Sequence, residues 1–270
     1  MRIMVATDGS RQAQEAVSFG IVLARALDAE FSMIGVADSK RHQTGLRVEL
    51  ETIAGELGYD KSIVVAVRVG QPAAQILQAL DEYSVDLLVV GTRKRGFMGR
   101  LLLGDTAQRL ARTVRIPMVI VRRSRAALRR ILVCTAGGEA GRKDVAVAAE
   151  IAAQTGAELT ILHVMSQIAA GFKAQADHLE RNAAWHQEHQ TREGQHLTEL
   201  LDLAAEYQVK CTAKLRSGLV VEEILDEARE GDYDLVVGGA HGSTGRHSFL
   251  LDDVTEELIS DLSRPVLIVR

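Results

Sequence analysis

Residues 130–135 read RILVCT, and they repeat residues 2–7, RIMVAT, at a distance of 128 positions. The same shift places the next apolar run, residues 29–36 (AEFSMIGV), on residues 157–164 (AELTILHV). Further along the chain the shift becomes 148, pairing Gly91 with Gly239 and Pro117 with Pro265. A constant shift over such lengths indicates two copies of one structural unit. We therefore expect the two copies to share one fold.

Each copy alternates short β-branched runs with longer segments of helical period, a pattern typical of β-α-β units and a parallel sheet. In the first copy we predict strands near residues 2–7, 30–36, 62–69, 86–91 and 117–122, with a helix starting from Ser10 as N-cap. The run Leu87–Val90 is apolar at every position, as expected for a central strand covered on both faces. A proline precedes the last strand of each copy, where its missing N–H is tolerated.

The predicted fold class is α/β, with two doubly wound five-stranded parallel-sheet domains that form a pseudo-dimer. We place the first domain at residues 1–123 and the second at residues 129–270. Exposed edges at the last strands are unfavourable, so we expect the neighbourhoods of Val119 and Leu267 to pair, within the chain or between chains of a homodimer.

The change of shift locates an insertion of 20 residues in the second copy, between Val164 and Arg216. The polar stretch of residues 172–207 predicts a long helix near 170–207. His186, His189 and Glu193 could share one face of it and bind a metal, although a solvated helix is the simpler interpretation. Trp185 offers an anchor for an unknown protein partner if it is exposed.

The charge balance argues against a nucleic-acid binder held by bulk electrostatics. Lys and Arg number 32 against 36 Asp and Glu, a formal charge of −4. No apolar run approaches the roughly 18 residues of a membrane span, and an acidic residue follows the first apolar residues too soon for a signal peptide. We therefore expect a cytoplasmic protein that binds neither nucleic acid nor membrane.

Two loops of each copy have the composition of a ligand site. In a doubly wound sheet, ligands bind beyond the carboxyl ends of the strands, where the strand order reverses. Thr7-Asp8-Gly9-Ser10 follows the first strand, and residues 91–106, GTRKRGFMGRLLLGDT, follow the fourth. Glycines, three consecutive basic residues and a helix beginning near Gly104 predict a phosphate cradle in the second of these loops.

Both copies resemble the universal stress protein family. The resemblance rests on a first-strand Asp and a fourth-strand loop of the form Gly-x2-Gly-x9-Gly-Ser/Thr, followed by a Pro-led last strand. It implies a five-stranded parallel sheet between helices, of the Rossmann-like or adenine nucleotide alpha hydrolase-like kind. It also implies dimerisation through the last strand, ATP binding in one branch of the family, and a role in survival under stress.

Neither copy carries the complete motif. In the first copy Lys94 stands in place of the second glycine and Asp105 in place of Ser/Thr. The candidate nucleotide-binding residues there are Thr7, Asp8, Gly9, Val36, Gly91, Arg93, Lys94, Gly96, Gly99, Gly104, Asp105 and Thr106. Those of the second copy, which we expect to be a degenerate site, are Thr135, Ala136, Val164, Gly239, His241, Gly242, Asp252 and Asp253.

Electrostatics favours the first copy as the binding site. A carboxylate at a phosphate-binding helix start repels the ligand, whereas lysine and arginine attract it. The first copy sets Arg93, Lys94 and Arg95 against Asp105, while the second has two aspartates at the corresponding place. The resemblance implies that Asp8 and the backbone at Val36 face base or ribose; the alternative is an empty turn inherited from an ATP-binding ancestor.

Three functions stay open from the sequence. The first is a stress-response regulatory module that binds ATP or a related adenine nucleotide, or acts as an interaction protein. The second is a slow Mg²⁺-dependent ATP hydrolase, for which the sequence offers no recognisable nucleophile turn and no Walker lysine. The third is a structural module that recruits a partner without nucleotide.

Overall fold

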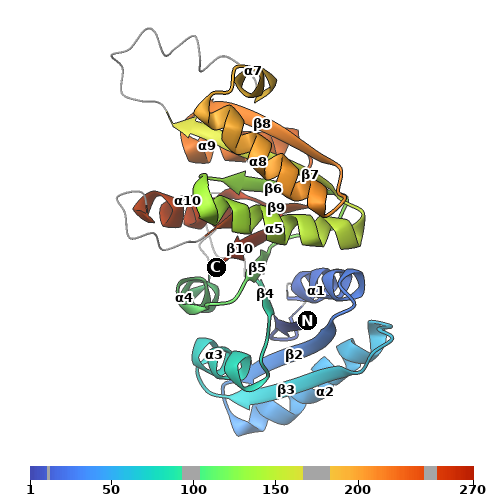
Figure 1. Ribbon diagram of the computed structural model, residues 1–270. Helices are drawn as coiled ribbons and strands as arrows, with labels where there is room; N and C mark the ends of the chain where they lie inside the picture. The colour runs from blue at the N-terminus through green and yellow to red at the C-terminus, as the bar shows by residue number, and fades with distance from the viewer. Residues whose placement is uncertain (11–12, 93–103, 167–182, 240–247) are drawn as a thin grey trace. The chain divides into compact units, whose positions relative to one another are not determined.

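The computed structural model describes residues 1–10, 13–92, 104–166, 183–239 and 248–270 (Figure 1). By their contacts, these residues form two compact units. Unit 1 comprises Met1–Ala127 together with Ser263–Ile268 and Arg270. Unit 2 comprises Leu128–Leu262 and Val269.

Unit 1 is a doubly wound α/β fold, as predicted. Its elements are β1 (Arg2–Ala6), α1 (Gln14–Ala26), β2 (Glu30–Ala37), α2 (Lys40–Glu56), β3 (Ile63–Val69), α3 (Pro72–Glu82), β4 (Leu87–Gly91), α4 (Asp105–Thr113) and β5 (Met118–Val121), with β10 (Val266–Val269) from the end of the chain. The strand order is β3-β2-β1-β4-β5-β10. The first five strands are parallel. In Figure 1, α1 and α2 lie on one side of this sheet and α3 and α4 on the other.

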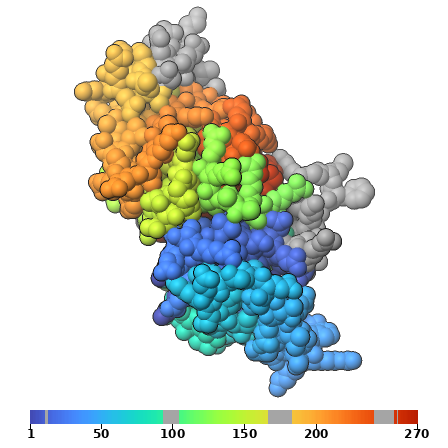
Figure 2. All heavy atoms as spheres, turned by 90° about the vertical axis from the view of Figure 1, so that its right-hand side faces the viewer, coloured from blue at the N-terminus to red at the C-terminus, as the bar shows by residue number. Residues whose placement is uncertain are grey.

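The core of unit 1 follows from its apolar strands. Leu87–Val90 are all buried in β4, which lies between β1 and β5, so the prediction of a central strand is confirmed. On β1, Ile3, Met4 and Val5 are also buried. Helix α1 packs closely there, because a Cβ at Gly20 would lie only 2.5 Å from Val5 Cγ2. Helix α2 is mostly exposed, with Leu50 as its buried residue, and its light-blue atoms project at the surface in Figure 2.

The edge of unit 1 next to β5 is paired with the end of the same chain. Strand β10 is antiparallel to β5, with Leu267 opposite Val119 and Ile268 opposite Met118. The prediction that these neighbourhoods pair is confirmed, and the pairing lies within the chain. Each of the two strands begins one residue after its proline, as predicted.

Unit 2 repeats the same order of elements. It contains β6 (Arg130–Thr135), α5 (Gly138–Thr155), β7 (Glu158–Ser166), α7 (Ala183–Glu188), α8 (Arg192–Glu206), β8 (Cys211–Gly218), α9 (Val220–Glu230), β9 (Leu235–Gly239) and α10 (Ser248–Asp261). Strands β9, β6, β7 and β8 are neighbours in that order and run parallel. This strand order corresponds to β4-β1-β2-β3 of unit 1, so the two copies have the same strand topology.

The predicted long helix near 170–207 is wrong in the part that the structure describes. Two helices, α7 and α8, replace it, and they are separated at Gln190, whose φ is 49°. Thr191 then caps α8, accepting a hydrogen bond from the backbone N–H of Gly194 at 3.1 Å. His186 and Glu193 therefore lie on different helices, so the residues do not share one helical face.

Helix α1 begins at Gln14, later than the predicted start at Ser10, although the Ser10 hydroxyl accepts a hydrogen bond from Ala13 N–H at 3.3 Å. In the described part of the chain, every helix is too short or too polar to cross a bilayer.

Candidate functional site

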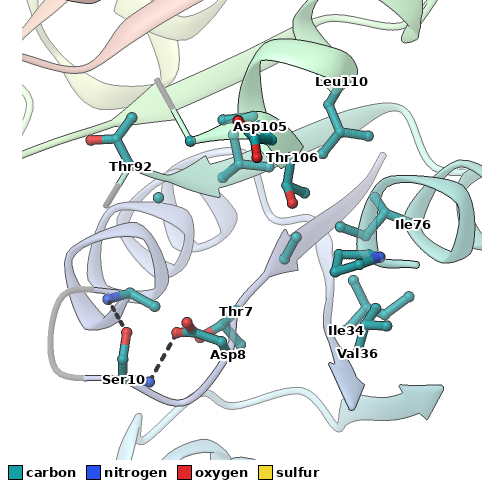
Figure 3. Close-up of a pocket in the computed structure, with 17 residues that line it drawn as sticks. Thr7, Asp8, Ser10, Ile34, Val36, Ile76, Thr92, Asp105, Thr106 and Leu110 are labelled. Carbon is teal, nitrogen blue, oxygen red and sulfur yellow. Dashed lines mark hydrogen bonds between the residues drawn. The ribbon is translucent and has the colours of Figure 1, made fainter. Parts of the chain in front are cut away.

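A cavity of about 290 Å³ opens in unit 1 at the carboxyl ends of β1 and β4 (Figure 3). The chain leaves β1 toward β2 on one side, while β4 and β5 lie on the other. This is the point of strand-order reversal where α/β sheets bind ligands. The described residues that line the cavity are Ala6, Thr7, Asp8, Ser10, Ala13, Ile34, Val36, Pro72, Ile76, Val90, Gly91, Thr92, Gly104, Asp105, Thr106, Ala107 and Leu110.

The turn after β1 is held by its own side chains. The Thr7 hydroxyl accepts a hydrogen bond from Gly9 N–H at 3.2 Å, and the Asp8 carboxylate accepts one from Ser10 N–H at 3.1 Å. Gly9 has a φ of 76°, and a Cβ there would lie 2.6 Å from the Glu49 carboxyl carbon. Only glycine suits this position without displacing Glu49. The turn thereby presents Thr7, Asp8 and Ser10 to the cavity, as Figure 3 shows.

An apolar wall faces this turn. Ile34 and Val36 project from the same face of β2, because residues two apart on a strand point the same way. Ile76 of α3 and Leu110 of α4 complete the wall (Figure 3). Sequence reasoning included Val36 but missed these other three. The strand period could have identified Ile34, whereas nothing local indicates that Ile76 and Leu110 meet it.

The start of α4 forms the opposite end of the cavity. Gly104 is the N-cap of α4, and Asp105 and Thr106 are its first residues, as the sequence predicted for a helix starting near Gly104. All three line the cavity together with Gly91 at the end of β4. Thr92 follows Gly91; it belongs to the loop 91–106 predicted from the sequence, although it was not among the candidate residues. Its hydroxyl oxygen is buried and has no hydrogen-bond partner among the described residues.

The remaining predicted residues of the first copy lie elsewhere. Gly9 shapes the turn but is not among the lining residues. Arg93, Lys94, Gly96 and Gly99 lie outside the described residues. The structure thus brings together Thr7, Asp8, Val36, Gly91, Gly104, Asp105 and Thr106.

In unit 2 the turn after β6 is similar but lacks the carboxylate. The Thr135 hydroxyl accepts a hydrogen bond from Gly137 N–H at 3.1 Å, as Thr7 does from Gly9. Ala136 replaces Asp8 and cannot form the second hydrogen bond. In place of Glu49, His196 of α8 lies against the glycine, where a Cβ at Gly137 would be 3.7 Å from His196 Nε2.

Two histidines pack behind this turn of unit 2. The His163 ring lies 5.8 Å from that of His196, edge to face, and His163 Nδ1 is 3.0 Å from the carbonyl oxygen of Thr135. Burial, and then the proximity of His163, lower the pKa of His196. His196 is therefore neutral near pH 7.

In unit 2 a different side chain lies at the strand end that corresponds to the cavity of unit 1. Ala107 lines the cavity in unit 1, and its equivalent in unit 2 is Thr255 of α10. Thr255 is buried, and its hydroxyl donates to the carbonyl oxygen of Gly239 at 3.4 Å. Val164 lies on β7. His241 and Gly242 lie outside the described residues; Asp252 and Asp253 fall within α10.

The described lining of the unit 1 cavity is part apolar and part hydrogen-bonding. It combines the apolar wall with the carboxylates of Asp8 and Asp105 and several hydroxyl groups, and none of these described residues is Lys, Arg or His. Within the described residues, no group of three or more His, Cys, Asp and Glu side chains could hold a metal ion.

Comparison with known proteins gives one family for both copies. A family model described as the universal stress protein family matches residues 1–122 and again residues 127–270. A universal stress protein of Mycolicibacterium smegmatis is 27% identical over 192 residues, which cover 69% of this chain and 62% of that protein. Another, from Methanocaldococcus jannaschii, is 28% identical over 142 residues, covering 45% of this chain and 82% of that protein.

Solved structures give the same fold over the whole chain. The crystal structure of a universal stress protein from Archaeoglobus fulgidus matches with a TM-score of 0.69 at 16% identity. The match covers 100% of this chain and 98% of that one. The present chain spans less than two thirds of the length of its Mycolicibacterium relative.

Proposed function

Because the chain belongs to the universal stress protein family in both of its halves, we propose that it is a stress-response regulatory protein that binds an adenine nucleotide or nucleoside in unit 1. In this proposal unit 2 keeps the backbone of the fold but has lost the ligand. The family resemblance indicates that the ligand is an adenine compound. The cavity of unit 1 is the place where we expect it to bind.

The observation that carries the proposal is the cavity at the strand-order reversal of unit 1. It joins the turn after β1 and the start of α4, which the sequence motif marks separately, and it also includes the end of β2. Its apolar wall, with Ile34 and Val36, offers a surface for a flat base. The carboxylate of Asp8 offers an acceptor for ribose hydroxyl groups.

The differences in unit 2 support a single binding site. Ala136 removes the acceptor that Asp8 provides in unit 1. Thr255 places a hydrogen-bonded hydroxyl at the end of β9, where unit 1 has the small side chain of Ala107. A ligand at that place would have to compete with a hydrogen bond that the protein already makes.

A matched pair of variants tests this proposal. Val36 lines the cavity, and Val164 is its equivalent in unit 2 under the 128-residue shift. We expect Val36→Phe to weaken binding of adenosine, AMP and ATP by about tenfold or more, because a phenyl ring fills part of the space that the ligand needs. Val164→Phe should leave binding within about twofold. Isothermal titration calorimetry measures the affinities, and native mass spectrometry counts the ligands per chain.

Two results would contradict the proposal. One is the absence of binding for all three compounds to the unaltered chain. The other is binding that Val164→Phe abolishes and Val36→Phe leaves intact, which would place the ligand in unit 2.

A further inference from the structure

Strand β3 lies at one end of the sheet of unit 1, and its sequence favours pairing with another strand. In the described part of the chain, β2 is the strand that pairs with it. Residues 63–69 read IVVAVRV, with five β-branched side chains, one charge and neither proline nor glycine. Short segments of this composition at the edge of a sheet pair readily with other chains. An uncovered β3 would therefore promote association of the protein.

The backbone groups of Val65 and Val67 point away from β2. On a strand of a parallel sheet, the N–H and C=O groups of successive residues turn alternately to one side and the other. Directly after β3, Gly70 N–H donates to the carbonyl oxygen of Ala37, the last residue of β2, at 3.1 Å. The even-numbered residues of β3 thus turn to β2. The odd-numbered residues Val65 and Val67 turn to the outer edge.

Two side chains of α2 bond to these outward carbonyl groups. Helix α2 packs along β3 (Figure 1). Gln43 Nε2 donates to the carbonyl oxygen of Val67 at 2.8 Å, and Arg47 Nη1 donates to that of Val65 at 3.4 Å. Four residues of a helix rise about 6 Å, and two residues of a strand rise about 6.6 Å. Donors four residues apart on α2 therefore match acceptors two residues apart on β3.

The equivalent strand of unit 2 differs in its side chains. Strand β8 pairs with β7 and corresponds to β3 under the 148-residue shift. Lys214 stands where unit 1 has Ala66, and Thr212 stands where it has Val64. A lysine on an edge strand opposes pairing with another chain. Unit 1 has no lysine on β3, so its edge depends more on the side chains of α2.

We propose that Gln43 and Arg47 of α2 occupy the outer carbonyl groups of β3 and thereby prevent β3 from pairing with the same strand of a second copy of the chain. A second copy is the partner that the sequence favours, because identical segments rich in β-branched residues stack on one another. Neither Gln43 nor Arg47 lines the cavity of unit 1, so this role is separate from ligand binding.

Replacing both donors by alanine tests the proposal. We expect Gln43→Ala with Arg47→Ala to raise the weight-average mass of the full chain by about twofold or more as its concentration increases, because the uncovered carbonyl groups accept N–H groups from a second β3. Arg41→Ala with Thr44→Ala is the matched control. It removes the same charge from exposed positions of α2 and should leave the mass unchanged. Sedimentation equilibrium measures the mass, and urea unfolding checks that each variant is folded.

A third change distinguishes pairing through β3 from association elsewhere. Val64 of β3 is 50% exposed, so Val64→Lys adds a charge to this edge that water can solvate. Added to the double variant, it should return the mass to that of the unaltered chain. If the double change unfolds the chain, Gln43→Ala alone is measured in its place, since it removes the shorter hydrogen bond. A variant that sediments like the control would overturn the proposal, and so would association that Val64→Lys does not reverse.

Discussion

Glu227 of α9 is a buried carboxylate that has no equivalent in unit 1. It is 1% exposed, and it accepts hydrogen bonds from Lys214 Nζ at 2.6 Å, Tyr233 Oη at 2.7 Å and Arg216 Nε at 2.9 Å. Burial alone would raise the pKa of Glu227, but the bonds from Lys214, Tyr233 and Arg216 outweigh it and hold the pKa below its ordinary value.

Apart from Arg68, the equivalent of Arg216, the corresponding positions of unit 1 are apolar. Under the 148-residue shift, Glu227 corresponds to Ala79, Lys214 to Ala66 and Tyr233 to Val85. Unit 2 thus replaces part of an apolar contact between helix and sheet with a hydrogen-bonded network of charges. Such a network is stable only while every member keeps its partner.

We predict that Glu227→Gln lowers the free energy of unfolding by about 3 kcal/mol at pH 7, because it removes the buried counter-charge that Lys214 and Arg216 share. A carboxylate with a depressed pKa stabilises the fold above its unfolded pKa of about 4.3, and this stabilisation is lost as the pH falls through the lower, folded value. The difference between the variant and the unaltered chain should therefore shrink below about pH 4. Urea unfolding across pH 3–7 measures it.

The control for this prediction is Glu82→Gln in unit 1. Glu82 pairs with Arg68 but is 55% exposed, so its loss should cost less than about 1 kcal/mol. Equal losses in both variants, or a loss for Glu227→Gln that does not depend on pH, would contradict the argument.

Among the elements, the pair α7 and α8 departs most from the repeat. The helices meet closely at Gly194, where a Cβ would lie 2.0 Å from the carbonyl oxygen of His186. His186 is buried, and its Nδ1 is 2.9 Å from the hydroxyl oxygen of Thr191, the N-cap of α8. Trp185 is half-buried and stacks on His189, with ring centroids 4.2 Å apart. The side chains between α7 and α8 are therefore well packed, and both His186 and His189 contribute contacts to this packing.

We predict that Gly194→Ala lowers the free energy of unfolding by about 1–3 kcal/mol, because the added methyl group must displace the backbone of α7. Gly45→Ala on α2 is the matched control, since a Cβ there meets nothing within 4 Å. That change should raise stability by about 0.5–1 kcal/mol through helix propensity. Denaturant unfolding compares the two, and a neutral or stabilising Gly194→Ala would show that the helices do not pack this way.

On the scale of the whole molecule, the end of the chain completes the sheet of unit 1. Residues Ser263–Ile268 belong to unit 1 by their contacts, and β10 covers the edge of β5. An uncovered edge strand invites pairing with another chain, so this arrangement protects the molecule against association through β5.

Oxidative cross-linking tests this pairing. Residues directly opposite on antiparallel strands have Cα atoms about 4.5–5.5 Å apart, which suits a disulfide. In a chain with Cys134 and Cys211 replaced by alanine, we expect Val119→Cys with Leu267→Cys to form a disulfide within one chain. Val119→Cys with Ile268→Cys, whose side chains point to opposite faces, should not. A covalent dimer on a non-reducing gel would instead place the pairing between chains.

The repeat, the fold class and the approximate positions of the strands could all be predicted from the amino-acid sequence. These depend on local features: Leu87–Val90 must be covered on both faces, and glycine is needed where the φ of Gly9 is positive. The break between α7 and α8 also depends on a local feature, the turn at Gln190. The sequence there is polar and contains no proline, so it does not indicate that a helix ends.

Which side chains come into contact depends on how the helices pack on the sheet. Ile76 and Leu110 reach the cavity because α3 and α4 pack side by side, and Thr255 reaches Gly239 because α10 covers the end of β9. These contacts join residues that are far apart in the chain, and their distances depend on how helices pack on the sheet. The loops of the site could therefore be located from the sequence, whereas packing decided that unit 1 has an open cavity and unit 2 a hydrogen-bonded threonine.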